Sequence, residues 1–317
     1  RESRISRQYH FKTQQPHELL GVRTRDDNKF TLRWRNMLKY EHLPWVKHHS
    51  FQGQALLPAS AYLIMALDAA KVVLNSRNAS IVELHNLKFS SGIVLEPDAD
   101  VEVLFSLTVE HESFEEIKAS FTLTSTQANG NIDMKKNFTG SMTVILEEPS
   151  ADVFPRRAQG QPETVRASEQ GFYKMMAETG LFYTGPFKGL QELRRRFNFS
   201  TAVVKRYHEE DTTSLRISPA TLDTCLQTAF VTISSPGDNS IWTSFLPVDI
   251  ESVRFNLAIC ERQNIHDFLY VDAYLTKESP ITENTGASFT ADIEIYNESG
   301  EMEIQVQGDR KSTRLNS

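Results

Sequence analysis

Apolar residues along this chain recur at helical intervals in two regions and alternate with polar residues in most of the others. Between residues 56 and 74 the apolar positions follow helical spacing, which predicts a long and mostly buried helix. Residues 101–109 alternate between apolar and polar side chains, as is typical of a strand with one buried face. Strands are expected after the helix at residues 81–95, 101–110, 116–125 and 137–146.

A second region repeats this order. A helix at residues 168–180 leads in, and a second buried helix at residues 218–233 has Ser218 as its N-cap and Pro219 at its first helical position. Long apolar helices accompanied by strands, twice, predict an α+β fold in which two antiparallel sheets each wrap around a central helix. The strands of this region are expected at residues 193–207, 245–256, 268–276, 286–296 and 302–308.

The segment between the two regions has no hydrophobic periodicity. It is rich in proline and charged residues, which is typical of a linker. We therefore predict an N-terminal unit at residues 1–148, a linker at 149–167 and a C-terminal unit at 168–308. Residues 309–317 are polar and aperiodic, and we expect a tail outside the fold. The chain begins without Met, so we expect a piece of a longer protein.

Composition and charge exclude some classes of function. The net charge is -7, and no basic stripe carries aromatic residues, so nucleic-acid binding is not expected. Two cysteines, Cys225 and Cys260, give neither a disulfide framework nor a zinc site, and they favour a reducing compartment. The sequence has no signal-peptide pattern and no apolar run of about 18 residues. We therefore expect a cytoplasmic protein with no membrane association.

Candidate chemistry first appears in the pattern His49-x3-Gly53-x4-Pro58. The chain is strand-like before His49, Gly53 permits a turn and close approach by a ligand, and a helix begins near Pro58. Free N–H groups at a helix start can polarise a carbonyl, so a base and an electrophilic stabiliser can share one loop. A purely structural histidine at position 49 also fits the residues alone. His48 projects elsewhere in an extended segment, and we interpret it as structural.

Asp223 lies inside the second apolar helix. A carboxylate in apolar surroundings is costly, so burial raises its pKa and would make Asp223 a proton donor near neutral pH. Gln227 lies one turn later on the same face and can hydrogen-bond to this carboxyl group. An exposed aspartate stabilised by the helix dipole fits the spacing equally well.

Two further segments are candidates for the walls of a binding site. In the segment from Tyr183 to Phe187, Gly185 and Pro186 force a rigid turn whose aromatic neighbours could line a slot. A packed turn without a binding role is the alternative. The dipeptide Leu246-Pro247 by itself indicates only a strand.

Taken together and in order, these features resemble the dehydratase domain of polyketide synthases and, more distantly, that of the animal fatty acid synthase. Each motif alone is weak, but the ordered set is specific and covers nearly the whole chain. The Tyr-Thr-Gly-Pro-Phe turn is most similar to the iterative, highly reducing synthases of fungi, whereas modular bacterial members usually have Tyr-Gly-Pro-x-Phe. The matching features are Leu19-Leu20-Gly21, Trp45, His49-x3-Gly53-x4-Pro58, Tyr183 to Phe187, Asp223-x3-Gln227, Leu246-Pro247 and Arg254-Phe255.

The resemblance implies a double hotdog fold in which each half supplies one catalytic residue to a shared tunnel. His49 would remove the proton alpha to the carbonyl of a 3-hydroxyacyl thioester, and protonated Asp223, held by Gln227, would protonate the leaving hydroxyl. The product would be a 2,3-enoyl thioester, usually trans. A backbone N–H near Gly53 would stabilise the developing oxyanion, and Tyr183 would position the substrate. The other residues expected at the substrate are Pro58, Gly185, Pro186, Phe187, Leu246 and Pro247.

The resemblance also implies partners. The substrate would arrive on the phosphopantetheine arm of an acyl carrier protein, with neighbouring synthase domains beside this one and a homodimer expected. No metal or other cofactor is expected, because side chains carry out both proton transfers.

Three other functions remain open. A product-template-like aldol cyclase also uses a His and Asp pair, and sequence alone does not separate it. A non-catalytic hotdog module would bind acyl chains or scaffold a dimer, which the presence of both His49 and Asp223 disfavours. A hotdog thioesterase is disfavoured by the Asp223-x3-Gln227 pair on the second helix.

Overall fold

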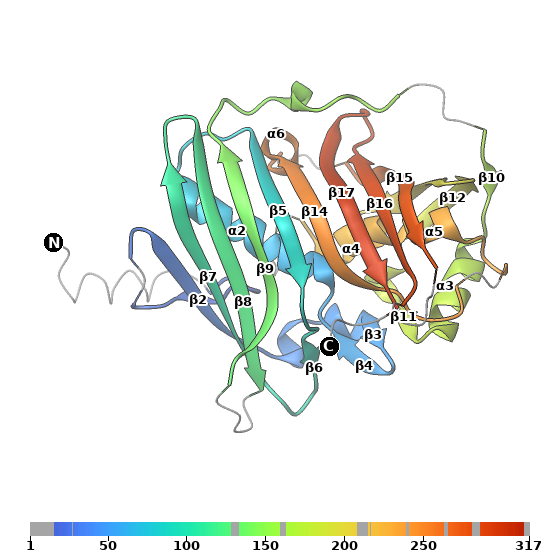
Figure 1. Ribbon diagram of the computed structural model, residues 1–317, viewed down its shortest axis with the longest axis horizontal. Coiled ribbons are helices and arrows are strands. Elements are labelled where there is room, and N and C mark those ends of the chain that lie inside the picture. The colour runs from blue at the N-terminus through green and yellow to red at the C-terminus, as the bar shows by residue number, and fades with distance from the viewer. Residues whose placement is uncertain are drawn as a thin grey trace.

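A single antiparallel sheet passes through both halves of the chain. The fold is described for residues 16–26, 28–127, 133–158, 163–207, 215, 217–238, 241–262, 266–280 and 286–313 in a computed structural model. The strand order among these residues is β1-β2-β7-β8-β9-β5-β14-β17-β16-β15-β13-β12-β10 (Figure 1). The predicted α+β class with antiparallel pairing is confirmed, and the two predicted sheets are continuous with one another.

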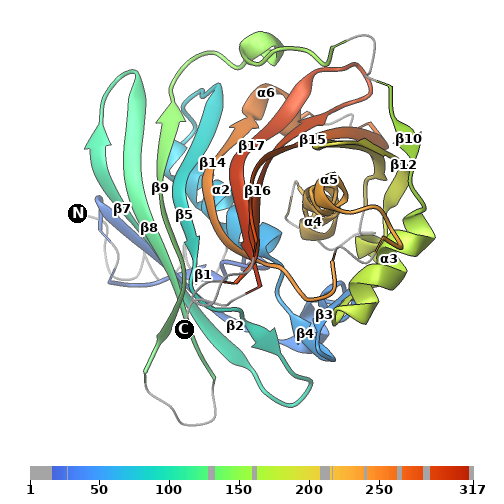
Figure 2. The same cartoon turned by 45° about the vertical axis from the view of Figure 1, so that its right-hand side comes forward.

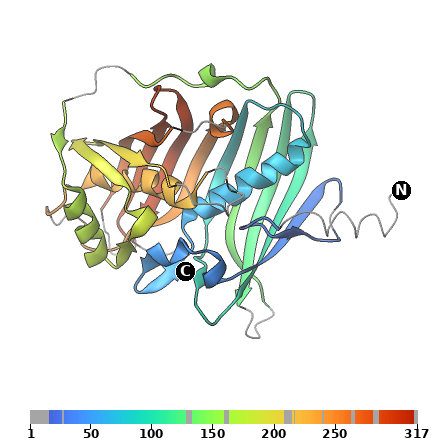
Figure 3. The same ribbon diagram turned by 180° about the vertical axis from the view of Figure 1, so that it is seen from behind.

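In the N-terminal half the sheet covers helix α2 (Ala59–Leu74), which lies across one of its faces (Figure 3). Alternate residues of β7 (Val101–Glu112) are buried from Val101 to Val109, as the sequence alternation predicts. These residues and the buried residues of α2 belong to the same hydrophobic core. The other strands of this half are β1 (Val22–Arg23), β2 (Thr31–Leu38), β5 (Ile81–Phe89), β8 (Glu116–Gln127) and β9 (Lys135–Ile145).

In the C-terminal half the sheet curls around helices α4 (Pro219–Gln227) and α5 (Phe230–Ile233), which Figure 2 shows inside the curl. The predicted helix at residues 218–233 is thus divided near Thr228. Ser218 is its N-cap residue and Pro219 its first helical residue, as predicted. The strands of this half are β10 (Val165–Arg166), β12 (Leu190–Arg196), β13 (Phe199–Lys205), β14 (Leu246–Asn256), β15 (Phe268–Ser279), β16 (Ser288–Tyr296) and β17 (Met302–Ser312).

Strands β5 and β14 join the two halves edge to edge. Val253 pairs with Leu84 in this antiparallel seam. Beside them, Arg254 Nε donates a hydrogen bond to Glu83 Oε1 at 2.6 Å. Arg254, one of the residues of the sequence resemblance, therefore links the two halves at the seam.

A small second sheet also links the halves. Its order is β11 (Leu181–Tyr183), β3 (His49–Phe51), β4 (Gln54–Leu56) and β6 (Val94–Leu95). Strand β11 comes from the C-terminal half and pairs with β3 from the N-terminal half, which sets Tyr183 directly opposite His49. The pairing fixes the position of the candidate base relative to the second half of the molecule.

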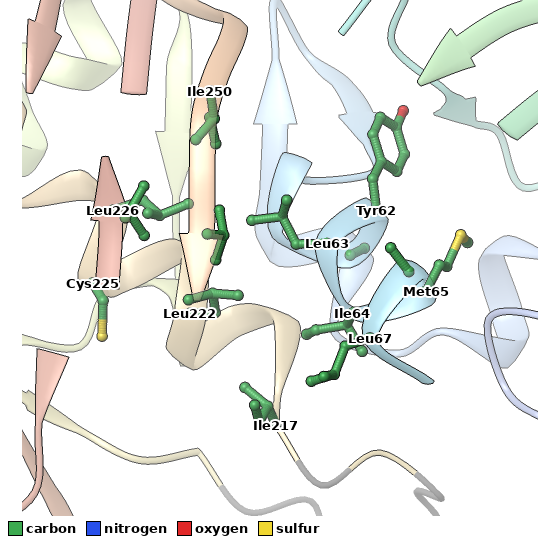
Figure 4. Packing of buried hydrophobic residues seen from close by; sticks show 14 of the residues in the cluster. Tyr62, Leu63, Ile64, Met65, Leu67, Ile217, Leu222, Cys225, Leu226 and Ile250 are labelled. Carbon is green, nitrogen blue, oxygen red and sulfur yellow. The ribbon is translucent and has the colours of Figure 1, made fainter. Parts of the chain in front are cut away.

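The two central helices pack against one another at their beginnings. Figure 4 shows Leu63 and Ile64 of α2 facing the apolar side chains of α4, including Leu222. Ser60 Oγ donates a hydrogen bond to the carbonyl oxygen of Pro219 at 2.8 Å, although both groups are buried. Residues that follow Pro58 and Pro219 are thereby brought together in the middle of the molecule.

Two predictions about the segments outside the elements need correction. Strand β17 continues to Ser312, so residues 309–312 are part of the sheet and the prediction of a tail from residue 309 was wrong. The predicted linker contains β10 and is held at Arg157, whose guanidinium donates to Asp272 Oδ2 and Oδ1 at 2.9 and 2.8 Å. Residues 1–15 of the predicted first unit and 314–317 of the predicted tail lie outside the described residues.

The remaining helices are short or peripheral. No helix within the described part of the chain has the length and apolar character needed to cross a bilayer. These elements are α3 (Glu169–Glu178), α6 (Leu257–Cys260), η1 (Tyr40–His42), η2 (Val46–His48), η3 (Ala151–Val153) and η4 (Gly185–Phe187).

Candidate active site

One pocket is lined by residues of both halves, where the beginnings of α2 and α4 meet the small sheet. Its wall includes His49 from β3 and Asp223 from α4, 174 positions later in the sequence. The other predicted site residues in this wall are Pro58, Tyr183, Gln227, Leu246 and Pro247. The structure therefore brings together most of the residues that sequence analysis singled out.

The imidazole of His49 is buried, with 5% of the residue exposed. Its Nδ1 lies 2.6 Å from the carbonyl oxygen of Leu56. A carbonyl oxygen can only accept a hydrogen bond, so Nδ1 carries the proton and donates it. In a neutral ring this leaves Nε2 as the basic nitrogen, and the bond to Leu56 fixes the orientation of the ring.

Two aromatic rings hold the imidazole from the side. The centroid of the Tyr183 ring lies 5.5 Å from that of His49, and the centroid of Phe187 lies 5.2 Å away. Burial raises the pKa of the Tyr183 phenol well above its usual value, with Asp223 and Tyr173 adding to the shift. Tyr183 therefore keeps its proton at neutral pH and can donate a hydrogen bond in the pocket.

The carboxyl group of Asp223 is also buried, and its partner is neutral. Gln227 Nε2 donates hydrogen bonds to Asp223 Oδ2 at 3.0 Å and to the carbonyl oxygen of Phe187 at 3.1 Å. Burial raises the pKa of Asp223, although His49 and the bond from Gln227 oppose the rise. The carboxyl group therefore tends to hold a proton that it can give to a neighbouring group.

Gly53, which was predicted to contact the substrate, lies outside the wall of the pocket. It is exposed in the turn that joins β3 to β4, and its φ is +83°. The register pairs Phe51 with Gln54, which leaves Gln52 and Gly53 as the two residues of the turn, both with positive φ. Gly53 is there because a tight hairpin requires this conformation.

The turn formed by Gly185, Pro186 and Phe187 also lies outside the pocket wall, which corrects the prediction that these residues line it. Gly185 has a φ of +47°, and a Cβ atom there would approach the ring of His48 within 2.8 Å. The fully buried side chain of Phe187 packs against the ring of His49, and the carbonyl oxygen of Phe187 accepts a hydrogen bond from Gln227 Nε2. The turn positions both candidate catalytic residues without contacting the pocket.

Several residues of the pocket wall were not predicted from the sequence. Tyr62 lies in the helix that was predicted only as mostly buried, and its hydroxyl accepts a hydrogen bond from the N–H of Ile93 at 3.0 Å. Asp309 and Lys311 of β17 were assigned to the tail. Residues 309–312 are all polar, so no hydrophobic alternation in the sequence marked them as part of a strand.

No group of three or more His, Cys, Asp or Glu side chains within the described residues is arranged to hold a metal ion.

Comparison with sequence families gives two matches that follow each other along the chain. Residues 17–126 match the polyketide synthase dehydratase domain, and residues 151–311 match a family described as the polyketide synthase dehydratase N-terminal domain. The second match alone covers half of the chain.

Similar sequences occur in much longer fungal proteins. A polyketide synthase–nonribosomal peptide synthetase hybrid of Aspergillus japonicus is 39% identical over 315 residues, which cover 97% of this chain and 8% of that protein. A reducing polyketide synthase of Botryotinia fuckeliana is 36% identical over 315 residues, 97% of this chain and 13% of that protein. The chain thus spans 8% and 13% of the lengths of these relatives.

Solved structures share the fold. The dehydratase domain from the CurK module of curacin polyketide synthase superposes with a TM-score of 0.75 at 18% identity, covering 95% of this chain and all of that one. The dehydratase domain of a mycocerosic acid synthase-like polyketide synthase gives a TM-score of 0.70 at 21% identity, covering 95% and 98%. These similarities identify the fold as a double hotdog. The chain belongs to the polyketide synthase dehydratase family, in the form found in fungal multidomain synthases.

Proposed function

We propose that this chain removes water from a 3-hydroxyacyl thioester to give a 2,3-enoyl thioester. The observation that carries the proposal is that His49 and Asp223, one from each half, line a single pocket. The first has a basic nitrogen, and the second is a carboxyl group whose burial favours its protonated form. A base and an acid on the same pocket match the two proton transfers of a dehydration.

In the proposed first transfer His49 acts as the general base. Nε2 takes the proton from the carbon alpha to the thioester carbonyl, and the C–H electron pair moves toward the carbonyl. The hydrogen bond from Nδ1 to the carbonyl oxygen of Leu56 would stabilise the imidazolium that forms. The base is ready for this step only while the ring is neutral.

In the proposed second transfer Asp223 acts as the general acid. Its carboxyl proton goes to the 3-hydroxyl group, the C–O bond breaks, and water leaves as the carbon–carbon double bond forms. Gln227 would hold the carboxyl group in place during both states, because its amide donates to Asp223 Oδ2. By analogy with the family, the double bond is usually trans.

The alpha proton is weakly acidic, so removing it needs a donor for the thioester oxygen. With Gly53 outside the pocket wall, the beginning of α2 is the best candidate. Ala59 is the first residue of this helix and lines the pocket. Its N–H has no acceptor within the helix, and the helix dipole favours negative charge at this end. We assign the oxyanion contact to this N–H.

Two solved relatives support the assignment of the two roles. Both are described as inactive mutants of the CurK dehydratase, one with histidine replaced by phenylalanine and one with aspartate replaced by asparagine. The altered positions, 996 and 1169 of that protein, are 173 residues apart. His49 and Asp223 are separated by 174 residues, so the two pairs correspond in spacing.

The carrier of the substrate and the assembly of the chain are part of the proposal. Relatives of this chain are multidomain synthases, which favours neighbouring synthase domains beside it. The thioester would then be presented on the phosphopantetheine arm of an acyl carrier protein, and the chain would act as a homodimer. In the proposed mechanism His49 and Asp223 carry out the two proton transfers without a metal or other cofactor.

Two other activities would use the same pocket. A product-template-like cyclase would form a carbon–carbon bond, and a hotdog thioesterase would release a free acid. A non-catalytic module would bind the acyl chain without changing it. The polar partner of Asp223, Gln227, favours dehydration, because a hydrogen-bonded and buried carboxyl group is suited to donating one proton.

Incubation with a short 3-hydroxyacyl pantetheine thioester tests the proposal. Mass spectrometry should detect loss of one water with the thioester intact, and the reverse reaction in deuterated water should place deuterium at the alpha carbon. A free acid would identify a thioesterase. An unchanged substrate, with chains of several lengths and loaded on a carrier protein, would overturn the proposal.

A further inference from the structure

Two oppositely charged side chains, Asp309 and Lys311, lie in the wall of the pocket and take no part in the chemistry described above. Both are on β17, with 1% and 4% of each residue exposed. Earlier in the strand the corresponding inward side chains are apolar, as at Ile304 and Val306. Charged residues at such positions are costly to bury, so their presence needs an explanation.

The two side chains form an ion pair. Lys311 Nζ donates a hydrogen bond to Asp309 Oδ2, and the ammonium lies 5.6 Å from the centre of the Phe230 ring. Asp309 Oδ1 is buried and has no hydrogen-bond partner among the described residues. A buried ion pair with an unsatisfied oxygen is a poor source of stability, since apolar residues of similar size often stabilise as well.

The pair lines the same pocket as the carboxyl group of Asp223 and acts on it electrostatically. The ammonium of Lys311 favours the ionised form of Asp223, and the carboxylate of Asp309 opposes it. The other titratable groups that face Asp223 are His49 from β3, Tyr183 from β11 and Tyr173 from α3. Lys311 is thus a cation that acts on this carboxyl group, and Asp309 is a group that compensates it.

An acid catalyst has to hold its proton at rest and release it during the reaction. Burial alone would make the proton of Asp223 hard to release, whereas an unpaired lysine nearby would remove it. The Asp309–Lys311 ion pair avoids both extremes, because each charge limits the effect of the other on the protonation of Asp223.

We propose that Asp309 and Lys311 are positioning residues for the dehydration, which together keep the pocket wall electrically balanced so that Asp223 can hold and release its proton. The inference rests on the proposed function. Neither residue needs to contact the substrate, and each acts through the carboxyl group of Asp223.

Three variants test the balance: Asp309→Asn, Lys311→Met and the double variant. The alkaline limb of the pH profile of kcat/KM reports the acid that must be protonated. We expect it to move to lower pH in Asp309→Asn and to higher pH in Lys311→Met, by about one pH unit each. The double variant should restore it to near the wild-type position. Single variants that leave this limb unchanged, or shift it in the same direction, would overturn the inference.

Glu303→Gln is a matched control on the same strand. Glu303 forms a buried ion pair with Arg206, but neither residue lines the pocket. This variant should lower the melting temperature as a broken ion pair does, and it should leave the alkaline limb in place. A shift equal to that of Asp309→Asn would mean that the effect comes from loss of stability.

An infrared titration separates the inference from the proposed function. The carbonyl band of the protonated Asp223 is identified by its absence in Asp223→Asn, and it can be followed with pH in a protein without activity. The midpoint of this titration should move in opposite directions in the two single variants and return to the wild-type value in the double variant. The double variant carries no unpaired buried charge, so it is expected to fold even where a single variant does not. The single variants decide the question, because an equal midpoint in wild type and double variant is also expected if the pair has no influence on Asp223. An unmoved midpoint in the folded single variants rejects the inference.

Discussion

Each of the two central helices carries an aspartate, half-buried in α2 and buried in α4, but gives it opposite properties. In α2, Asp68 lies 3.0 Å from His17 Nε2 and 3.1 Å from Lys71 Nζ. Burial would raise its pKa, but these two partners outweigh burial and lower it. In α4, Asp223 has a neutral amide partner, and burial raises its pKa. Burial alone therefore does not decide whether an aspartate holds a proton, because the charge of its partners does.

The helices also begin alike. A Pro-Ala pair stands at the beginning of each, with Pro58 as the N-cap of α2 and Pro219 as the first residue of α4. The fourth residue after each proline lines the pocket. In α2 this residue is Tyr62, and in α4 it is Asp223. The N-terminal half thus supplies its reactive group from the strand before the helix, and the C-terminal half supplies it from the helix. In the proposed mechanism, each half of the repeated fold supplies one proton transfer.

Loss of the base should have the largest effect. His49→Phe keeps an aromatic ring between Tyr183 and Phe187 but removes Nε2, so turnover of a 3-hydroxyacyl thioester should fall by about 10²–10⁴-fold. His48→Gln is the matched control, because His48 bonds Thr184 and lies outside the pocket wall. The control should keep turnover within about threefold, as a surface change does. Steady-state kinetics measures both, and equal losses would reject a special role for His49.

Replacing the aspartate of each central helix with asparagine should affect turnover in one helix and not in the other. Asp223→Asn keeps the shape but removes the transferable proton, so turnover should also fall by about 10²–10⁴-fold. Asp68→Asn should leave turnover nearly unchanged at a temperature where the variant is folded. If Asp68→Asn lost activity as steeply as Asp223→Asn, the contrast between the helices would have no functional meaning.

The same two variants should differ in how their stability depends on pH. The pKa of Asp223 is raised by folding, so wild-type protein loses stability as pH rises through the folded pKa, and Asp223→Asn avoids that loss. This variant should be more stable than wild type by about 1 kcal/mol at alkaline pH, with the difference vanishing in acid.

The contribution of Asp68 to stability changes with pH in the opposite direction. Its pKa is lowered by folding, so its contribution is present above the unfolded pKa and is lost as pH falls through the folded pKa. Asp68→Asn should be less stable than wild type by about 3 kcal/mol at neutral pH, and the gap should close in acid. Denaturant unfolding at several pH values measures both differences. Parallel curves for the two variants would contradict the assigned protonation states.

The smallest expected effect concerns the neutral partner of Asp223. Gln227→Leu removes the amide that holds Asp223 and the carbonyl of Phe187, and kcat should fall about tenfold with little change in KM. Thr224→Val on the same helix removes a buried hydrogen bond to Ala220 and serves as the control. The control should lose about 1 kcal/mol of stability and keep kcat. Equal kcat in the two variants would remove Gln227 from the site.

The sequence predicted the central helices and most strands, because their side chains follow one period over many residues. His49, Asp223, Tyr183 and Gln227 could be singled out, because each belongs to a motif with defined spacing. Their meeting in one pocket depends on the pairing of β3 with β11, and pairing between distant strands leaves no local pattern. The seam between β5 and β14 was missed for the same reason.

The end of the chain illustrates a different limit. Gly308 has a φ of +67° and marks an irregularity in β17, where the register with β16 shifts. A bulge moves the inward positions by one residue, so Ile304 and Val306 point inward before it and Asp309 and Lys311 after it. Polar residues on a shifted period look aperiodic in sequence. The structure shows that they belong to the pocket.

The pH dependence of kcat/KM for wild type, His49→Phe and Asp223→Asn tests the division of labour most directly. Wild-type activity should fall in acid, where the imidazole takes up a proton, and in alkali, where the carboxyl group loses one. The residual activity of His49→Phe should lack the acid limb, and that of Asp223→Asn should lack the alkaline limb. A flat wild-type profile, or two variants that lose the same limb, would contradict a base and an acid supplied by separate halves.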